Sequence, residues 1–320
     1  MGSIPPASSV EYDQREIVAV IKYAYDKGLI DFNNVACAAP SNSDLTQLLK
    51  AIFGMTNKNK LQADVIIYTN SGVTGDDLTG DGTAAKPYKT IQKAINTAQA
   101  VIDVNRQHKI TFKNTGTFTQ PTYLSGAFAG QAGMGSIVFD NTAATFETLH
   151  GSCFSIYLGA SCMIKGGTYA ASWDGVGSSQ GIGINCGGFG GVNIDGVTFG
   201  VCASAHIWSE GNVQVNTPYT IAGSSPYHWM IMPPGGVWFS SGPGAPLPSI
   251  NVVGNPGFTV FARVHGGELR MSAPITGTAT GQRYNITGFG VIGSGGGGPN
   301  KFPGTVAGTI ATNTGNGEYI

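Results

Sequence analysis

Beyond Lys109, the chain alternates short apolar runs with gaps that contain glycine or asparagine. Each run is too short for a helix, and its rich content of Val, Ile and Phe is typical of β-strands. Short strands that are separated by glycine corners are what one turn of a β-solenoid requires. The sequence therefore predicts strands over residues 110–112, 136–139, 154–158, 162–164, 182–184, 192–194, 197–199, 213–215, 237–239, 250–253, 258–264, 269–271 and 291–292.

Internal repetition supports a solenoid. Lys-Gly-Gly-Thr-Tyr at 165–169 and Asp-Gly-Val-Thr-Phe at 195–199 read as the same strand on adjacent turns. The segment 235–240 is echoed by 266–272, and 288–294 then follows. Spacings of about 20 to 35 residues are typical of a solenoid whose loops vary in length. A β-sandwich of similar short strands is the competing fold.

The N-terminal third has a different pattern. Apolar residues at helical spacing predict helices over 10–28 and 44–53, and residues 1–61 are interpreted as a helical attachment and oligomerisation region. The alternative for this region is an ordinary packed cap. Residues 62–108 predict a strand at 65–68, an Asp/Gly-rich loop and a helix from Ile91 to Ile102 with Thr90 as N-cap. The remaining residues, 109–320, form the predicted solenoid.

Two segments carry a resemblance to a known family. Gly-Asp-Gly-Thr-Ala-Ala-Lys-Pro-Tyr-Lys-Thr-Ile-Gln-Lys-Ala-Ile at 80–95 resembles the first segment of right-handed β-helix proteins of the pectate-lyase-like superfamily, particularly bacteriophage tail fibres and tailspikes. Segments 272–284 and 290–308, and the end near 318–320, are similar to the closing part of phage and prophage tail proteins. The resemblance implies a mainly β fold, a right-handed parallel β-helix with a small α-helical N-terminal region.

The same resemblance implies a function and partners. It indicates a homotrimeric virion protein, a tail fibre or spike, that is synthesised in the host cytoplasm. The N-terminal region would dock on other virion tail or neck proteins, and the β-helix would bind a host surface polysaccharide or another receptor. Two alternatives remain open, a tailspike enzyme that depolymerises the glycan and a purely architectural fibre or collar component.

Composition and charge narrow the class of ligand. The 320 residues include 49 glycines, only 11% are charged and the formal net charge is −1, which fits neither a disordered chain nor collagen. No Lys or Arg lies between Lys165 and Arg263, so binding to a nucleic-acid backbone is not expected. No apolar run approaches the length of a membrane span, and the first residues show no secretory signal. We therefore expect no membrane insertion.

Candidate binding residues are concentrated in one window. All four tryptophans lie between residues 173 and 238. Flat aromatic rings stack on the apolar faces of sugars at low entropic cost. We predict glycan binding by part of this set, with filling of the interior or of an interface between protomers as the alternative. The candidate residues are Trp173, Trp208, Trp229, Trp238 and Tyr227.

Catalysis, cofactors and metals have weaker support. A glycosidase needs two carboxylates about 5 to 9.5 Å apart, and Asp174 and Glu210 are the pair nearest to tryptophans. A polysaccharide lyase also needs a basic residue near the abstracted proton, for which His206 is the candidate. The protein is more simply interpreted as a non-enzyme. The loop with Asp76, Asp77 and Asp81 lacks the spacing of an EF-hand, so we expect turns there and neither a metal nor a cofactor.

The five cysteines are widely spaced and contain no Cys-x-x-Cys pair. Cys153, Cys162, Cys186 and Cys202 fall among the apolar runs, and we expect them to be buried thiols. Cys37 lies alone in the N-terminal region and is the candidate for an intermolecular disulfide.

Overall fold

The structure, a computed structural model, describes residues 22, 26, 58–175, 181–241, 246–311 and 317–320. Cys37, with its expected disulfide, lies outside the described residues. The same holds for the two N-terminal helices, apart from Lys22 and Asp26, whose backbone is helical.

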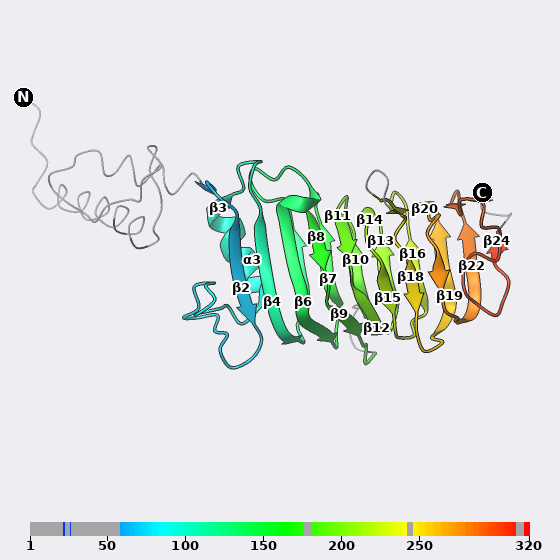
Figure 1. The fold of residues 1–320 in the computed structure, drawn as a ribbon, viewed down its shortest axis with the longest axis horizontal. Helices are drawn as coiled ribbons and strands as arrows, with labels where there is room; N and C mark the ends of the chain where they lie inside the picture. The colour runs from blue at the N-terminus through cyan, green and yellow to red at the C-terminus, as the bar shows by residue number, and fades with distance from the viewer. Residues whose placement is uncertain (1–21, 23–25, 27–57, 176–180, 242–245, 312–316) are drawn as a thin grey trace, which may run out of the picture.

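The described chain is mainly β, and its long sheets are entirely parallel, which is compatible with a β-helix. The strands stack along the long axis of the molecule in sequence order (Figure 1). They form three columns, in which each strand pairs with its counterpart from the preceding and the following pass of the chain. We call one pass through the columns a tier.

Column 1 is an eight-stranded sheet of β5 (Thr122–Ser125), β7 (Ser152–Tyr157), β10 (Ile182–Cys186), β13 (Ala205–Ser209), β16 (Tyr227–Ile231), β19 (Gly257–His265), β22 (Thr280–Thr287) and β24 (Thr309–Ile310). Column 2 contains β2 (Val65–Asn70), β4 (Ile110–Phe118), β6 (Ile137–Thr148), β8 (Ser161–Lys165), β11 (Gly191–Asp195), β14 (Asn212–Val215), β17 (Gly236–Phe239), β20 (Glu268–Arg270), β23 (Val291–Gly293) and β25 (Glu318–Tyr319). Column 3 contains β9 (Thr168–Ala171), β12 (Thr198–Cys202), β15 (Tyr219–Ile221), β18 (Ile250–Val252) and β21 (Ile275–Thr276). It is joined to column 2 because β4 and β6 extend through both.

The register shows how tier length varies. Ala205 pairs with Ile182 and with Tyr227, whereas Tyr227 pairs with Val260, so successive tiers begin 23, 22 and 33 residues apart. The predicted equivalence of 165–169 and 195–199 is confirmed, because Lys165 pairs with Asp195 and the strands continue in phase.

The echo between 235–240 and 266–272 is real but shifted. Val237 pairs with Leu269, one residue further along than the aligned glycines indicate. Gly266 has a φ of +66° and takes the additional position in the corner before β20. A left-handed residue of this kind lets the corner lengthen without disturbing the strands on either side.

Helix α3 (Ile91–Val101) lies at the N-terminal end of the stack (Figure 1). The Thr90 side chain caps it by accepting a hydrogen bond from the backbone N–H of Lys93, as the sequence predicted. The side-chain amide of Gln92 donates to the backbone oxygen of Tyr123 and accepts from its N–H. It thus makes the two hydrogen bonds that the backbone of a neighbouring strand would make. Gln99 adds bonds to the end of β5. The helix therefore protects the first edge of column 1, a position that is otherwise open to unwanted pairing. The buried face of the helix consists of Ile91, Ala94, Ile95 and Ala98.

The acidic loop before this helix forms turns. Asp77 accepts hydrogen bonds from the N–H groups of Lys89 and Thr90 and from the Thr90 hydroxyl. Asp76 accepts from the N–H of Leu78, and this bond, followed by one from Thr79, lowers the pKa of that carboxyl. Across the described residues, no group of three or more metal-ligating side chains is assembled. Asp77 thus positions the start of α3, and Asp76 stabilises the turn before it.

The interior is filled by rings that stack from tier to tier. Phe112 lies 4.9 Å from Phe139, and Phe146 lies 4.8 Å from Tyr169, both pairs being stacked. Such pairs add about 0.5–1.5 kcal/mol each to the free energy of area burial.

Four cysteines are buried in the same interior as free thiols, as expected. Burial raises the pKa of Cys153 to about 11 and that of Cys186 to about 12. The thiolate form that reacts or binds metal is therefore scarce at neutral pH.

A buried amide ladder runs along the junction of columns 2 and 3. The Thr69 hydroxyl donates to Asn114, Asn114 donates to Asn141, and Asn141 donates to the hydroxyl of Tyr169. Tyr169 then donates to the backbone oxygen of Gly166. Each buried polar group is satisfied by the next tier, so the ladder holds four tiers in register.

Replacing Asn141 by alanine is expected to lower the free energy of unfolding by about 1–3 kcal/mol, because the buried Asn114 amide loses its acceptor. Chemical denaturation measures this change. Asn251→Ala, at an exposed position on the outer surface of column 3, is the matched control and should change stability by less than about 0.5 kcal/mol. Equal effects of the two substitutions would show that the ladder does not stabilise the fold.

Candidate functional site

An aromatic surface lies on the outward side of column 1. Trp208 pairs with Met230, which pairs with Arg263 on the next tier, so the three side chains stand in one row. Trp208 and Tyr227 also pack around the buried residues Ile182, Ala205 and Met230. We call Trp208, Tyr227, Met230 and Arg263 the aromatic face. Its rings are carried by rigid strands, which keeps them ready for a ligand.

Arg263 orders one end of this face. Its guanidinium group lies 5.4 Å from the centre of the Tyr227 ring and donates a 2.9 Å hydrogen bond to the Tyr227 hydroxyl. The cation and the ring therefore hold each other in place. Arg263 ends the long stretch that lacks Lys and Arg, so it is the positive charge that the sequence supplies to this face.

A small pocket adjoins the aromatic face at the corner between columns 1 and 2. The indole Nε1 of Trp208 donates a 3.1 Å hydrogen bond to Glu210, and Glu210 lines the pocket together with Trp238. The Trp238 ring extends across Gly236, where a Cβ atom would lie only 2.3 Å from it, so this position requires glycine. The pocket has a volume of about 310 Å³ and is lined by Phe189, Gly190, Glu210, Gly211, Asn212, Pro234 and Trp238. We call it the corner pocket.

Phe189 is a site residue that sequence reasoning missed. Its side chain is 80% exposed and its backbone has a φ of +60°, a conformation that non-glycine residues adopt at a cost. Leu158 occupies the same corner one tier earlier, with a φ of +54° and an exposed side chain. The available signal was the sequence Gly-Gly-Phe-Gly-Gly at 187–191, in which an isolated ring among glycines has no strand to bury it.

The other two candidate tryptophans do not join this site. Trp229 is fully buried and packs edge-to-face against Phe239, Phe261 and Phe302, so its ring is not available to a sugar. This corrects its assignment as a glycan-binding residue. Trp173 is 47% exposed, but it lies in the turn after β9, at the opposite edge of column 1 from Glu210.

His206 is buried in the interior and is corrected as a candidate base. Its Nε2 lies 2.9 Å from the backbone oxygen of Gly200, so this nitrogen carries the hydrogen and donates. Its Nδ1 consequently accepts from Nδ1 of His228, 3.0 Å away, and Nε2 of His228 accepts from the Tyr219 hydroxyl at 2.6 Å. Burial lowers the pKa of His206 to about 3 and lowers that of His228 well below its ordinary value. Both imidazoles are neutral parts of the core.

The two candidate carboxylates are not brought together. Asp174 lies before β10 and pairs with His150 at 3.4 Å, whereas Glu210 follows the last residue of β13. A strand of five residues separates these edges of column 1, which corresponds to about 16 Å. This distance exceeds the separation of about 5–9.5 Å that glycosidases use.

Comparisons with known proteins identify no relative of this chain. No protein-family model matches the chain, and no curated protein or solved structure matches it. In the described part of the chain, every helix is too short or too polar to span a bilayer.

Proposed function

We propose that this protein is a tail fibre or spike of a bacteriophage virion, and that its chain forms a right-handed parallel β-helix that binds a host surface glycan. The observation that carries the proposal is the cluster of Trp208, Glu210 and Trp238, where two indole rings flank one hydrogen-bonded carboxylate. The resemblance of residues 80–95 and 272–320 to phage tail proteins supports the virion part.

The chemistry of the cluster fits a sugar. Indole and phenyl rings offer apolar surface to the C–H face of a pyranose, and Glu210 is an acceptor for its hydroxyl groups. The glycines beside Phe189 and Glu210 leave the mouth of the corner pocket open. A polyphosphate is disfavoured, because the lining contains a carboxylate and no cation.

A homotrimer would strengthen such binding. Three identical sites that bind weakly gain affinity on a repetitive polymer, because the second and third contacts form within one complex. In this proposal, residues 1–61 attach the trimer to other virion proteins of the tail or neck, and the solenoid meets the host.

Glycan cleavage is the second candidate function, because Glu210 already lies in a pocket with aromatic walls. Glu210 is the sole carboxylate in the lining of the corner pocket, and the proposed partner Asp174 lies at the other edge of column 1. We therefore rank binding above cleavage. An architectural role in a fibre or collar is the outcome if neither activity is found.

Retention on immobilised bacterial envelope polysaccharides tests the proposal. We expect Trp208→Ala and Trp238→Ala each to weaken retention about tenfold or more, because each removes a ring of the cluster. Trp173→Ala is the matched control, since it removes an exposed indole from the opposite edge, and it should leave retention unchanged.

Release of new reducing ends is followed in the same incubation. If the wild type releases new reducing ends and Glu210→Gln does not, the protein is a glycan-cleaving enzyme and the binding function is replaced by this activity. Wild-type retention by both folded cluster variants, or no retention by any polysaccharide, would contradict the proposal and favour the architectural role.

A further inference from the structure

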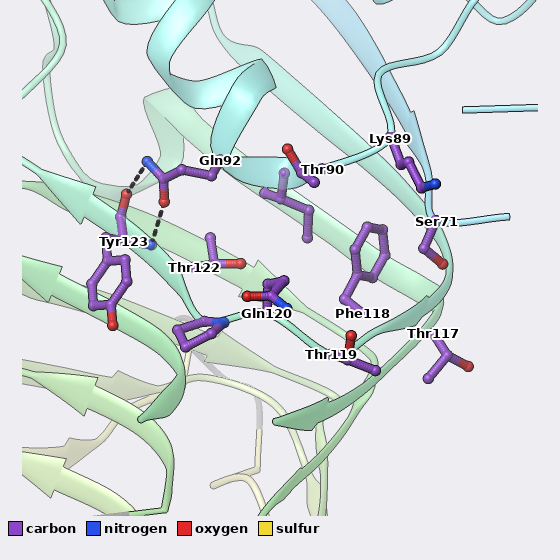
Figure 2. A pocket seen from close by; sticks show the side chains of 12 residues that line it. Ser71, Lys89, Thr90, Gln92, Thr117, Phe118, Thr119, Gln120, Thr122 and Tyr123 are labelled. Atoms are coloured by element: carbon purple, nitrogen blue, oxygen red, sulfur yellow. Dashed lines mark hydrogen bonds between the residues drawn. The ribbon is translucent and has the colours of Figure 1, made fainter. Parts of the chain in front are cut away.

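A second pocket opens at the N-terminal end of the solenoid, between the first turn of α3 and the corner that connects β4 to β5 (Figure 2). Its volume is about 570 Å³, within the usual range for small-molecule sites. It shares no lining residue with the corner pocket. We call it the cap pocket. Its lining consists of Ser71, Lys89, Thr90, Ile91, Gln92, Thr117, Phe118, Thr119, Gln120, Pro121, Thr122 and Tyr123.

The walls of the cap pocket are held in place by the fold. Gln92 binds the backbone of Tyr123 through both atoms of its amide, as Figure 2 shows. Ile91 and Phe118 belong to the hydrophobic core, and Thr90 is fixed by Asp77. Asp77 accepts from the N–H groups of Lys89 and Thr90, so these two donors are not available to a ligand. The pocket is preformed and needs no rearrangement to accept a ligand.

Thr122 is the residue that points to a ligand. Its side chain is only 3% exposed, yet its hydroxyl has no hydrogen-bond partner in the described part of the chain. The enclosed side-chain atoms that lack a partner in the described residues do not include this oxygen, so it is reached from the open pocket and is available to a ligand there. The side chains of Thr119 and Gln120 also make no hydrogen bond with the described residues. Three polar side chains, those of Thr119, Gln120 and Thr122, therefore remain available around an apolar floor.

The charge and polarity of the lining select the class of ligand. Lys89 is the sole charged residue of the cap pocket, and no carboxylate lines it. A free amino acid would leave its ammonium group unpaired, and a nucleotide would need more than one cation. Hydroxyl and amide groups suit the hydroxyls of a sugar, and the apolar floor formed by Ile91 and Phe118 suits its C–H face.

We propose that the cap pocket binds one acidic sugar unit, with its carboxylate at Lys89 and a ring hydroxyl bonded to Thr122. In Figure 2, Lys89 and Ser71 lie at one end of the pocket and Gln92 and Tyr123 at the other, so the sugar ring lies between them against Phe118. The choice of this ligand depends on the pocket lining and not on the function proposed for the aromatic face.

Titration of the full-length protein with glucuronic acid and with glucose, followed by saturation-transfer NMR, tests this proposal. We expect saturable binding of both sugars, with glucuronic acid the tighter. Lys89→Gln should weaken glucuronic acid about tenfold and leave glucose unchanged, because it removes only the charge-assisted contact. Thr122→Val, which keeps the side-chain shape, should weaken both sugars about fivefold to tenfold.

Controls separate this site from folding and from the aromatic face. Lys86→Gln removes a neighbouring exposed charge outside the lining and should have no effect. Thr122→Ser retains the hydroxyl and should bind as the wild type does, which remains informative if Thr122→Val does not fold. The same titrations are made on Trp208→Ala, in which sugar binding at the aromatic face is removed, so that the remaining binding reports the cap pocket and the two proposals can fail separately.

Three results would overturn the proposal. The first is the absence of saturable binding by either sugar. The second is binding that Lys89→Gln and Thr122→Val both leave unchanged. The third is competition by sulfate as strong as that by glucuronic acid without any binding of glucose, which would make the cap pocket a simple anion site.

Discussion

Acidification below pH 6.5 is expected to lower the free energy of unfolding, by up to about 1 kcal/mol per pH unit for His206 and in the same direction for His228. The pKa of His206 is about 3 in the folded chain, against an ordinary value of 6.5. The unfolded chain therefore takes up its proton first. The stability that these groups contribute is complete above pH 6.5 and is lost as the pH falls towards 3.

The direction follows from the hydrogen-bond chain around the two imidazoles. His206 Nδ1 and His228 Nε2 both act as acceptors, so protonation of either ring breaks a buried hydrogen bond and places a charge in the core. The surrounding groups are the Tyr219 hydroxyl and the rings of Phe199 and Phe258, and no carboxylate from the described residues hydrogen-bonds either imidazole. Nothing nearby compensates an added positive charge.

Urea denaturation midpoints between pH 7 and about pH 4.5 measure this effect, since ordinary carboxyl groups titrate mainly below that range. The double substitution of His206→Gln and His228→Gln should flatten the dependence, because amides keep hydrogen-bonding capacity without titrating. His150→Gln removes a partly exposed histidine and should leave the steep dependence intact. An unchanged slope in the double variant would refute the assignment.

Trp229→Ala is expected to destabilise the protein by about 3–5 kcal/mol, the usual cost of removing a large aromatic side chain from a packed core. Trp229 is fully buried among Phe239, Phe261 and Phe302, and its removal leaves a cavity between β17, β19 and the segment before β24 that carries Phe302. The partly exposed Trp173 provides the comparison, and Trp173→Ala should cost less than about 1 kcal/mol.

Thermal and urea denaturation of the two variants, side by side, measure the difference. A similar loss in both variants would show that the ring of Trp229 is not an essential part of the core. The comparison also helps to interpret the polysaccharide-retention experiment, because any loss of retention by Trp229→Ala would reflect unfolding and not a lost sugar contact.

Local signals were enough to predict much of the fold. The apolar spacing of Ile91, Ala94 and Ile95 and the cap at Thr90 predicted α3 correctly, since both are properties of one helix. The pairing of Lys165 with Asp195 was predictable because the two corners have related sequences. The 33-residue step from Tyr227 to Val260 was harder, because a long insertion between strands removes the repeat from a sequence comparison.

The candidate site was predicted only in part. Trp208, Trp238 and Glu210 were selected as residues and do come together, whereas Phe189 was overlooked. Its exposure depends on a left-handed backbone position, which sequence patterns do not specify for a phenylalanine.

The sequence by itself determined the β character, the glycine corners, the cap helix and the burial of four cysteines, because each depends on neighbouring residues. Only the tertiary structure decided which tryptophan is available to a ligand. Ile207 pairs with Trp229 on the inward side of column 1, and Trp208 pairs with Met230 on its outward side. The two tryptophans differ by one position in the register of the paired strands, and this difference places the Trp229 ring in the core and the Trp208 ring on the outward side.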